Sequence, residues 1–336
     1  MSRGTGLLTA ALAAIAVLVG CSAPAGSTGA AAVERITVVT TAPIESMSYA
    51  PEMVATARGD FARHGLEVDY QALQGSPAAL QAVLGGSAVL TRLGDIETMV
   101  AVGARGAPLR VVGTEQALGP VRIASSTRAP VRTPADLVGK TVGIPSQGGT
   151  SEWTLNLVLA RGGVDPASVR REVVGLAPGV FDLVTAGRID AYMTPLDTAT
   201  VLQHTRPEAV VLDPNSVVSA GAQVFVAAAD QLADPATEDR LRRYLAAIRD
   251  AMDFVAADAP TGYAETTKVI TSRYTVPSLA DPAVVKAGLD AYVASWGSPR
   301  VVTSADRWTA AYAEVSGQGL VPAGQDPQAW LHPLGP

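Results

Sequence analysis

Residues 133–153 read TPADLVGKTVGIPSQGGTSEW, and this stretch decides how the surrounding chain is interpreted. Its pattern predicts a short capped helix, a buried strand over Lys140–Ile144, a loop of small residues and a helix that begins at about Gly149. A helix that begins there directs its free backbone N–H groups and its positive dipole end beyond the strand. The stretch therefore predicts a site for an anion or a carbonyl group. An ordinary connection between a strand and a helix is the alternative.

The composition of the chain indicates two domains of ordinary size. It has 336 residues, of which 48% are hydrophobic and 17% are charged, so there is ample material for buried cores. The formal net charge is −6. An acidic balance of this kind argues against a nucleic-acid-binding protein and provides no basic patch for a membrane surface.

The first residues predict an export signal and a lipid anchor. Residues 1–21 contain an apolar run over Leu7–Val19, which is too short to span a bilayer, and they end in LVGC, which resembles the bacterial lipobox. Cys21, the only cysteine of the chain, would then be lipidated, whereas a plain secretory signal is the alternative. Residues 22–34 read as a flexible tether. We therefore expect the rest of the chain to be anchored by lipid to the extracytoplasmic side of the cell membrane.

Strands and helices alternate along the chain in two successive runs, as in parallel βαβ units. The first run has predicted strands at residues 35–41, 66–73, 87–93 and 108–114, with one continuous helix over 49–63 and further helices up to 84 and over 96–104. The second has strands at 140–144, 169–174, 188–193 and 210–212, with helices over 150–160, 179–186 and 195–204. Three more helices follow. Two of them carry Trp296 and Trp308 on their apolar faces, and we expect these tryptophans to pack in the core rather than bind a ligand.

The topology of the predicted strands indicates two lobes joined by a hinge. Residues 222–228 form one more apolar segment without a strand partner ahead of it, so we expect it to return to the first sheet. The chain would then cross between the lobes twice, near residues 121–125 and 217–224. This assigns residues 35–122 and 222–336 to the first lobe and 123–221 to the second.

Several short motifs along these two runs resemble one protein family. They are ARGDF (57–61), HGLEV (64–68), AVLGG (82–86), GAPL (106–109), DLVGKTVG (136–143) and AGRIDA (186–191). Their order and spacing resemble the solute-binding proteins of bacterial ABC importers, in the branch for nitrate, sulfonates, taurine and thiamine-pyrimidine precursors. One departure is the sequence Gly86–Val89, where the family usually has an aspartate.

The resemblance implies an α/β fold of the periplasmic-binding-protein type 2, with two lobes that close over a small solute by hinge motion. It also implies a monomer that delivers the solute to an ABC permease and its ATPase. We expect no cofactor, and the positions of the three histidines predict no metal site. Family binding residues lie on the loops after the strands. By position these are Glu45, Tyr49, Gly75, Ser76, Gly94, Asp95, Glu115, Gln116, Ser146, Gly149, Thr150, Ser151, Trp153, Thr194 and Asp197.

Two other classes of function remain as alternatives. An enzyme is disfavoured because His64, His204 and His332 fall at predicted helix ends and in the tail, and Ser146 lacks the glycine pattern of a nucleophile elbow. Some enzymes that form pyrimidines share the fold, but they use His- and Cys-rich motifs that this sequence lacks. A sensor or structural lipoprotein of the same fold is the other alternative.

The sequence leaves two ligand classes open. The Gly149-Thr150-Ser151 helix start favours an oxyanion such as a sulfonate, carboxylate or nitrate. The acidic residues of the candidate loops instead suit an amine or an aminopyrimidine, stacked on Tyr49, Tyr192 or Trp153. These acids are Glu45, Asp95, Glu115, Glu152 and Asp197.

Overall fold

The computed structural model describes residues 33–177 and 179–335. The predicted signal sequence, Cys21 and most of the predicted tether lie outside these residues. Glu34, predicted as the end of the tether, is already the first residue of a strand. In the described part of the chain, no helix is both long enough and apolar enough to cross a membrane.

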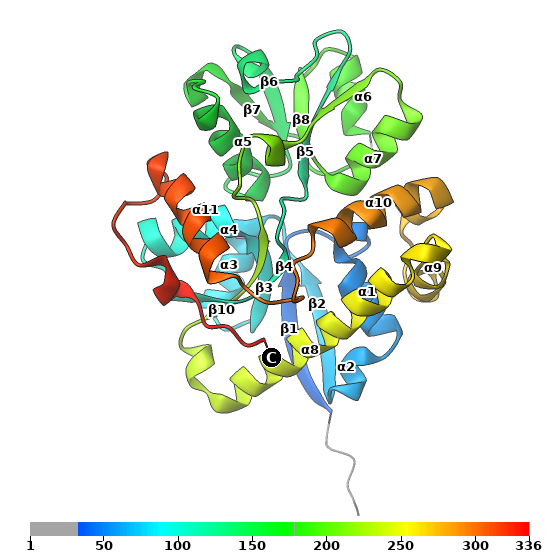
Figure 1. Cartoon of the computed structure of the whole chain (residues 1–336), viewed down its shortest axis with the longest axis vertical. Helices are drawn as coiled ribbons and strands as arrows, with labels where there is room; N and C mark the ends of the chain where they lie inside the picture. Colours follow the sequence, from blue (N-terminus) through cyan, green and yellow to red (C-terminus); the bar gives the residue numbers. More distant parts are fainter. Residues whose placement is uncertain (1–32, 178, 336) are drawn as a thin grey trace, which may run out of the picture. The chain divides into compact units, whose positions relative to one another are not determined.

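The first sheet has five strands in the order β2-β1-β3-β10-β4 (Figure 1). Their bounds are β1 Glu34–Thr40, β2 Leu66–Ala72, β3 Leu90–Gly94, β4 Leu109–Gln116 and β10 Gln223–Ala228. β1 pairs in parallel with β2 and β3, whereas β10 runs antiparallel between β3 and β4. The predicted return of residues 222–228 to the first sheet is therefore confirmed.

The second sheet also has five strands, in the order β7-β6-β8-β5-β9. Their bounds are β5 Val121–Ser126, β6 Thr141–Ile144, β7 Arg170–Val173, β8 Ala191–Pro195 and β9 Ala209–Leu212. β6 pairs in parallel with β7 and β8, and β5 runs antiparallel to β8 and β9. All of β5 belongs to this sheet, so Val121 and Arg122, which the sequence assigned to the first lobe, are residues of the second sheet.

The chain passes between the sheets at two places, as expected for the two-lobe fold. One passage follows β4 and leads into β5, and the other follows β9 and leads into β10. Hydrogen bonds hold the passages in place. Asn215 exchanges two with the backbone of Gly119, and Asp95 Oδ1 accepts one from the N–H of Gly221 at 2.8 Å.

Helices cover the faces of both sheets (Figure 1). Those of the first lobe are α1 Ala50–Ala57, α2 Asp60–Arg63, α3 Ser76–Leu84, α4 Asp95–Met99, α8 Pro235–Ala257, α9 Ala264–Thr271, α10 Pro282–Ser295 and α11 Ala305–Gly317. Those of the second lobe are α5 Thr150–Arg161, α6 Val180–Thr185 and α7 Leu196–Thr205. Trp296 and Trp308 are buried in apolar clusters, as predicted.

Three local predictions were wrong. The predicted continuous helix over 49–63 is broken by Gly59, which has φ 73°, a left-handed conformation that glycine adopts without steric cost. The predicted helix over 96–104 is α-helical only to Met99 and continues as a π-helix over Val100–Ala104. Strand β4 extends through Glu115 and Gln116, which the sequence placed in a loop.

Candidate ligand-binding site

A cavity of about 580 Å³ lies between the two lobes, at the carboxyl ends of the strands. Ligands of open α/β sheets bind beyond these strand ends, and a cavity of this size matches small-molecule sites. The first lobe contributes loop residues after β1 and β2, and the second contributes loop residues after β6, β7 and β8. A hollow of about 660 Å³ on the C-terminal helices α9 and α10 lies away from the strand ends and has mainly small and aliphatic walls.

Two helix N-termini, one from each lobe, meet at this cavity. Gly75 and Ser76 begin α3, and Gly149 and Thr150 begin α5. A Cβ atom added at Gly75 would lie 2.7 Å from Ser146 Oγ, and one added at Gly149 would lie 2.8 Å from the same atom. The first N–H groups of a helix have no partner inside it, and each N-terminus carries about half a positive charge. The arrangement can therefore hold an anion or a carbonyl oxygen.

Glu97 of α4 connects the two lobes beside the helix starts. Its Oε1 accepts a hydrogen bond from the N–H of Gly94 at 2.9 Å and another from the hydroxyl of Thr150 at 3.0 Å. The carboxyl group is buried. The hydroxyl of Thr150 therefore donates to Glu97. The backbone N–H of Thr150 is the group that remains for a ligand.

Burial also makes Glu97 a source of pH-dependent stability. Burial raises the pKa of this carboxyl group from 4.5 to about 7, although hydrogen bonds from Ser76, Gly94 and Thr150 lower it. The folded protein therefore keeps a proton that the unfolded chain releases, so the free energy of unfolding falls as pH rises from about 4.5 to about 7. The slope per group is at most about 1.4 kcal/mol per pH unit.

We expect Glu97→Gln to reduce this slope, because the amide keeps a hydrogen-bond acceptor but cannot titrate. Denaturant unfolding at several pH values between 5 and 8 measures the effect. Glu67→Gln, at an exposed residue of β2, is the control and should keep the wild-type slope. An equal slope in Glu97→Gln and wild type would contradict the raised pKa of Glu97.

Arg92 of β3 lines the cavity and is held from behind by two carboxyl groups. Its Nη1 contacts Glu115 Oε2, and its Nε lies 3.7 Å from Glu52 Oε1. Burial raises the pKa of Glu52 to about 8 and also raises the pKa of Glu115, although Arg92 opposes both shifts. Burial disfavours the charge of Arg92, but the two carboxyl groups outweigh it and raise the pKa of Arg92.

The same guanidinium shapes the wall of the cavity. It donates to the backbone carbonyl of Ser48 at 2.9 Å and to Ser48 Oγ at 3.1 Å, and its carbon lies 4.2 Å from the centre of the Tyr49 ring. On the opposite side, Asp197 of α7 accepts a hydrogen bond from the hydroxyl of Tyr292 at 3.2 Å, and burial raises the pKa of Asp197.

The structure brings together many of the residues that the sequence predicted for the site. Those that line the cavity are Glu45, Tyr49, Gly75, Ser76, Ser146, Gly149, Thr150, Ser151 and Asp197.

The other predicted site residues do not line it, because backbone or side-chain partners hold them elsewhere. Gly94 packs beneath Thr150. Asp95, the first residue of α4, accepts hydrogen bonds from the N–H groups of Ile96 and Gly221. Trp153 donates to the carbonyl of Gly148 at 3.1 Å. The remaining three are buried inside strands: Glu115, Gln116 and Thr194.

Sequence reasoning missed several residues of the cavity. Arg92 had a usable signal, since an arginine inside an otherwise apolar strand needs a buried partner. Tyr292 reads as one of the apolar residues of its helix, and nothing in the sequence places it beside Asp197. Further missed residues of the wall are Thr41, Thr198, Gln223 and Ser278.

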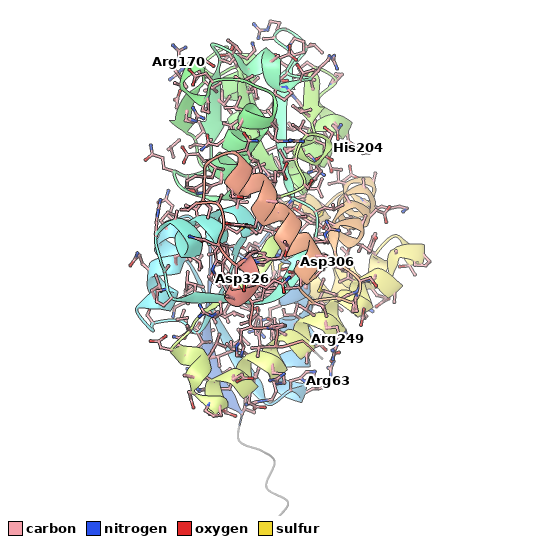
Figure 2. The ribbon with its side chains drawn as sticks, turned by 60° about the vertical axis from the view of Figure 1, so that its left-hand side comes forward. Arg63, Arg170, His204, Arg249, Asp306 and Asp326 are labelled. Carbon is pink, nitrogen blue, oxygen red and sulfur yellow. The ribbon has the colours of Figure 1, made fainter. Side chains whose placement is uncertain are left out.

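The histidines lie away from this cavity. His64 Nε2 lies 2.8 Å from Asp250 Oδ2, and His204 Nδ1 lies 3.1 Å from the carbonyl oxygen of Thr200. Figure 2 shows His204 at the outer side of the second lobe. Within residues 33–177 and 179–335, no group of three or more His, Cys, Asp or Glu side chains is arranged to hold a metal ion.

A comparison with protein families identifies the chain. The family model described as NMT1/THI5 like matches residues 46–261, more than half of the sequence. The chain belongs to the NMT1/THI5-like family. This NMT1/THI5-like protein is 27% identical over 183 residues to the riboflavin-binding protein RibY of Chloroflexus aurantiacus, a match that covers 50% of this chain and 52% of RibY. The match thus spans about half the length of that relative.

Solved structures share the fold of this NMT1/THI5-like protein. The alkanesulfonate-binding protein SsuA of Xanthomonas axonopodis pv. citri, bound to MOPS, is 20% identical with a TM-score of 0.69, covering 90% of this chain and 100% of SsuA. The periplasmic nitrate-binding protein NrtA of Synechocystis PCC 6803 is 14% identical with a TM-score of 0.67, covering 88% of this chain and 84% of NrtA. The predicted family resemblance and the two-lobe α/β fold are therefore confirmed.

Proposed function

We propose that this protein is the extracytoplasmic solute-binding component of an ABC import system. It captures a small solute in the cavity between its lobes and delivers the solute to a permease that is driven by an ATPase. The single observation that supports this most is the meeting of the α3 and α5 N-termini, one from each lobe, at a cavity of about 580 Å³. A solute held by both helix starts favours the closed arrangement of the lobes.

The lining of the cavity favours a solute with an oxyanion or a carbonyl-type acceptor over an amine. The amine alternative relied on acidic loop residues, and of these only Glu45 and Asp197 line the cavity. Asp197 already accepts a hydrogen bond from the hydroxyl of Tyr292. The helix starts, by contrast, present N–H donors with the residues Ser76, Ser146 and Ser151 around them. Pro43, Leu176 and Ala177 add exposed apolar surface for an organic body, so the cavity suits an organic solute better than nitrate alone.

A thermal-shift screen followed by calorimetry tests the proposed function. The panel contains MOPS, taurine, isethionate, nitrate, riboflavin and thiamine-pyrimidine precursors, which sample the classes that the relatives and the lining suggest. We expect at least one organic member with an acceptor group to raise the melting temperature in a concentration-dependent way and to give a one-site isotherm. A panel that leaves the protein unchanged at millimolar concentration would contradict the proposal.

We also propose that Cys21 carries the lipid that attaches the protein to the membrane. The proposal rests on the LVGC sequence alone. Cys21→Ser should move the protein from the membrane fraction to the soluble extracytoplasmic fraction, or leave an uncleaved precursor, because a hydroxyl cannot form the thioether. Fractionation with immunodetection measures this, and Ser22→Ala serves as the control. A Cys21→Ser protein that fractionates like the wild type would refute the anchor.

Catalysis is not part of the proposed role. Within the described residues, the walls of the cavity contain no histidine or cysteine, the side chains that most often serve as general base or nucleophile. We therefore expect binding to be reversible and each solute to be recovered chemically unchanged from the complex.

A further inference from the structure

The buried cluster of Arg92, Glu115 and Glu52 gives the cavity an unusual electrostatic character. Among the described residues that line the cavity, Arg92 is the only cationic side chain. A free arginine in such a place would bind a carboxylate, sulfonate or phosphate through two parallel hydrogen bonds. Arg92 is not free in this sense, because its hydrogen bonds go to protein atoms.

The two carboxyl partners of Arg92 lie away from the cavity and are excluded from solvent. The side chain of Arg92 is 4% exposed, that of Glu115 is 0% exposed and that of Glu52 is 2% exposed. Neither glutamate lines the cavity. Glu115 projects from β4, which is separated from β3 by β10, and Glu52 comes from the first turn of α1. Two carboxyl groups from different elements therefore converge on one guanidinium.

We propose that Glu115 and Glu52 are specificity-determining residues, which neutralise Arg92 and thereby make the cavity discriminate against solutes with two negative charges. The inference rests on the proposed function of the same cavity. With Arg92 neutralised, a solute oxyanion meets the partial charges of two helix N-termini, which together match about one negative charge. A second negative charge would find no cation and would face Glu45 and Asp197 in the lining.

The cluster also has a geometric role, which the test must separate from its charge. Arg92 positions Ser48 and Tyr49, so any variant that displaces the guanidinium also changes the shape of the wall. Glutamine at position 115 keeps an oxygen that accepts from Arg92 and removes the charge only. In Glu115→Gln, Glu52 remains close to Arg92 and can ionise in place of Glu115, so both carboxyl groups must be changed to uncover the charge of Arg92. Melting temperature and near-UV circular dichroism report whether the wall is kept.

The probes for the test are isethionate and sulfoacetate, which share a two-carbon sulfonate skeleton and carry one and two negative charges at pH 7. Calorimetry measures the dissociation constant of each for wild type, Glu115→Gln, Glu52→Gln and the double variant Glu115→Gln/Glu52→Gln. We expect wild type to prefer isethionate. We expect the double variant Glu115→Gln/Glu52→Gln to shift the ratio of the two dissociation constants toward sulfoacetate by about tenfold or more, because the buried charge of Arg92 near the ligand is then uncovered. Glu52→Gln alone should leave the ratio close to that of wild type, because burial raises the pKa of Glu52 to about 8 and this carboxyl group is largely protonated at pH 7.

Glu67→Gln is the matched control, because it removes one negative charge from an exposed side chain of β2 and should leave the ratio unchanged. Wild-type binding with an unchanged ratio in the double variant Glu115→Gln/Glu52→Gln would overturn the role of the cluster while leaving the proposed function intact. If wild type binds neither probe but binds another member of the solute panel, the charge selection proposed here is wrong. If it binds nothing on that panel, the proposed function fails.

Discussion

Gly149→Asp is expected to weaken the binding of an anionic solute by at least about 100-fold, which corresponds to about 2.7 kcal/mol. Gly149 is the residue before α5, and it lines the cavity together with Thr150 and Ser151, where we place the acceptor of the solute. A carboxylate there would occupy the free N–H groups and repel an anion. A Cβ at this position would also lie 2.8 Å from Ser146 Oγ, so this hydroxyl would have to move.

The same substitution should not unfold the protein. Gly149 has φ −94° and ψ 173°, an extended conformation that aspartate adopts readily, and aspartate is among the preferred residues at this position of a helix. Binding and stability are therefore expected to change independently. Gly149→Asn, which has the same shape without the charge, is the control and should lose less affinity for an anion. Calorimetry with near-wild-type affinity for Gly149→Asp would show that the acceptor of the solute lies elsewhere.

Arg92→Met is expected to lower the free energy of unfolding by about 3–5 kcal/mol, the usual cost of leaving a buried charge without its partner. Glu115 and Glu52 would remain in a site with almost no solvent contact. Denaturant unfolding with tryptophan fluorescence measures the change.

The matched variant removes the carboxyl charges together with the arginine. Arg92→Met combined with Glu115→Gln and Glu52→Gln should recover part of the lost stability, because no uncompensated charge remains. A triple variant that is less stable than Arg92→Met would mean that the cost comes from the shape of the arginine and its contacts with Ser48 and Tyr49.

The fold could be predicted from the sequence because its main signals are local and periodic. Short β-branched strands alternate with amphipathic helices in two runs, and one unpartnered strand at residues 222–228 requires a return to the first sheet. The helix starts at Gly75 and Gly149 are likewise local features, marked by small residues directly after strands. That they meet in space follows from the topology, since both follow the carboxyl ends of parallel strands.

The missed parts of the site depend on contacts between residues far apart in the chain. Glu115 is separated from Arg92 by 23 positions in the sequence. Whether Glu115 lies in a loop or pairs with a buried guanidinium depends on how far β4 extends. Asp95 reads equally well as a ligand-binding residue and as a helix cap, and its bond to Gly221 joins residues that are 126 positions apart. Burial and pairing of this kind are decided by tertiary packing, which a single sequence does not display.

The crystal structure of the protein with the organic solute that binds best is the most direct test of the account. We predict that the solute lies between the lobes and that its acceptor group is within hydrogen-bond distance of backbone N–H groups at the starts of both α3 and α5. A solute that contacts only one lobe, or one that lies in the hollow between α9 and α10, would contradict it.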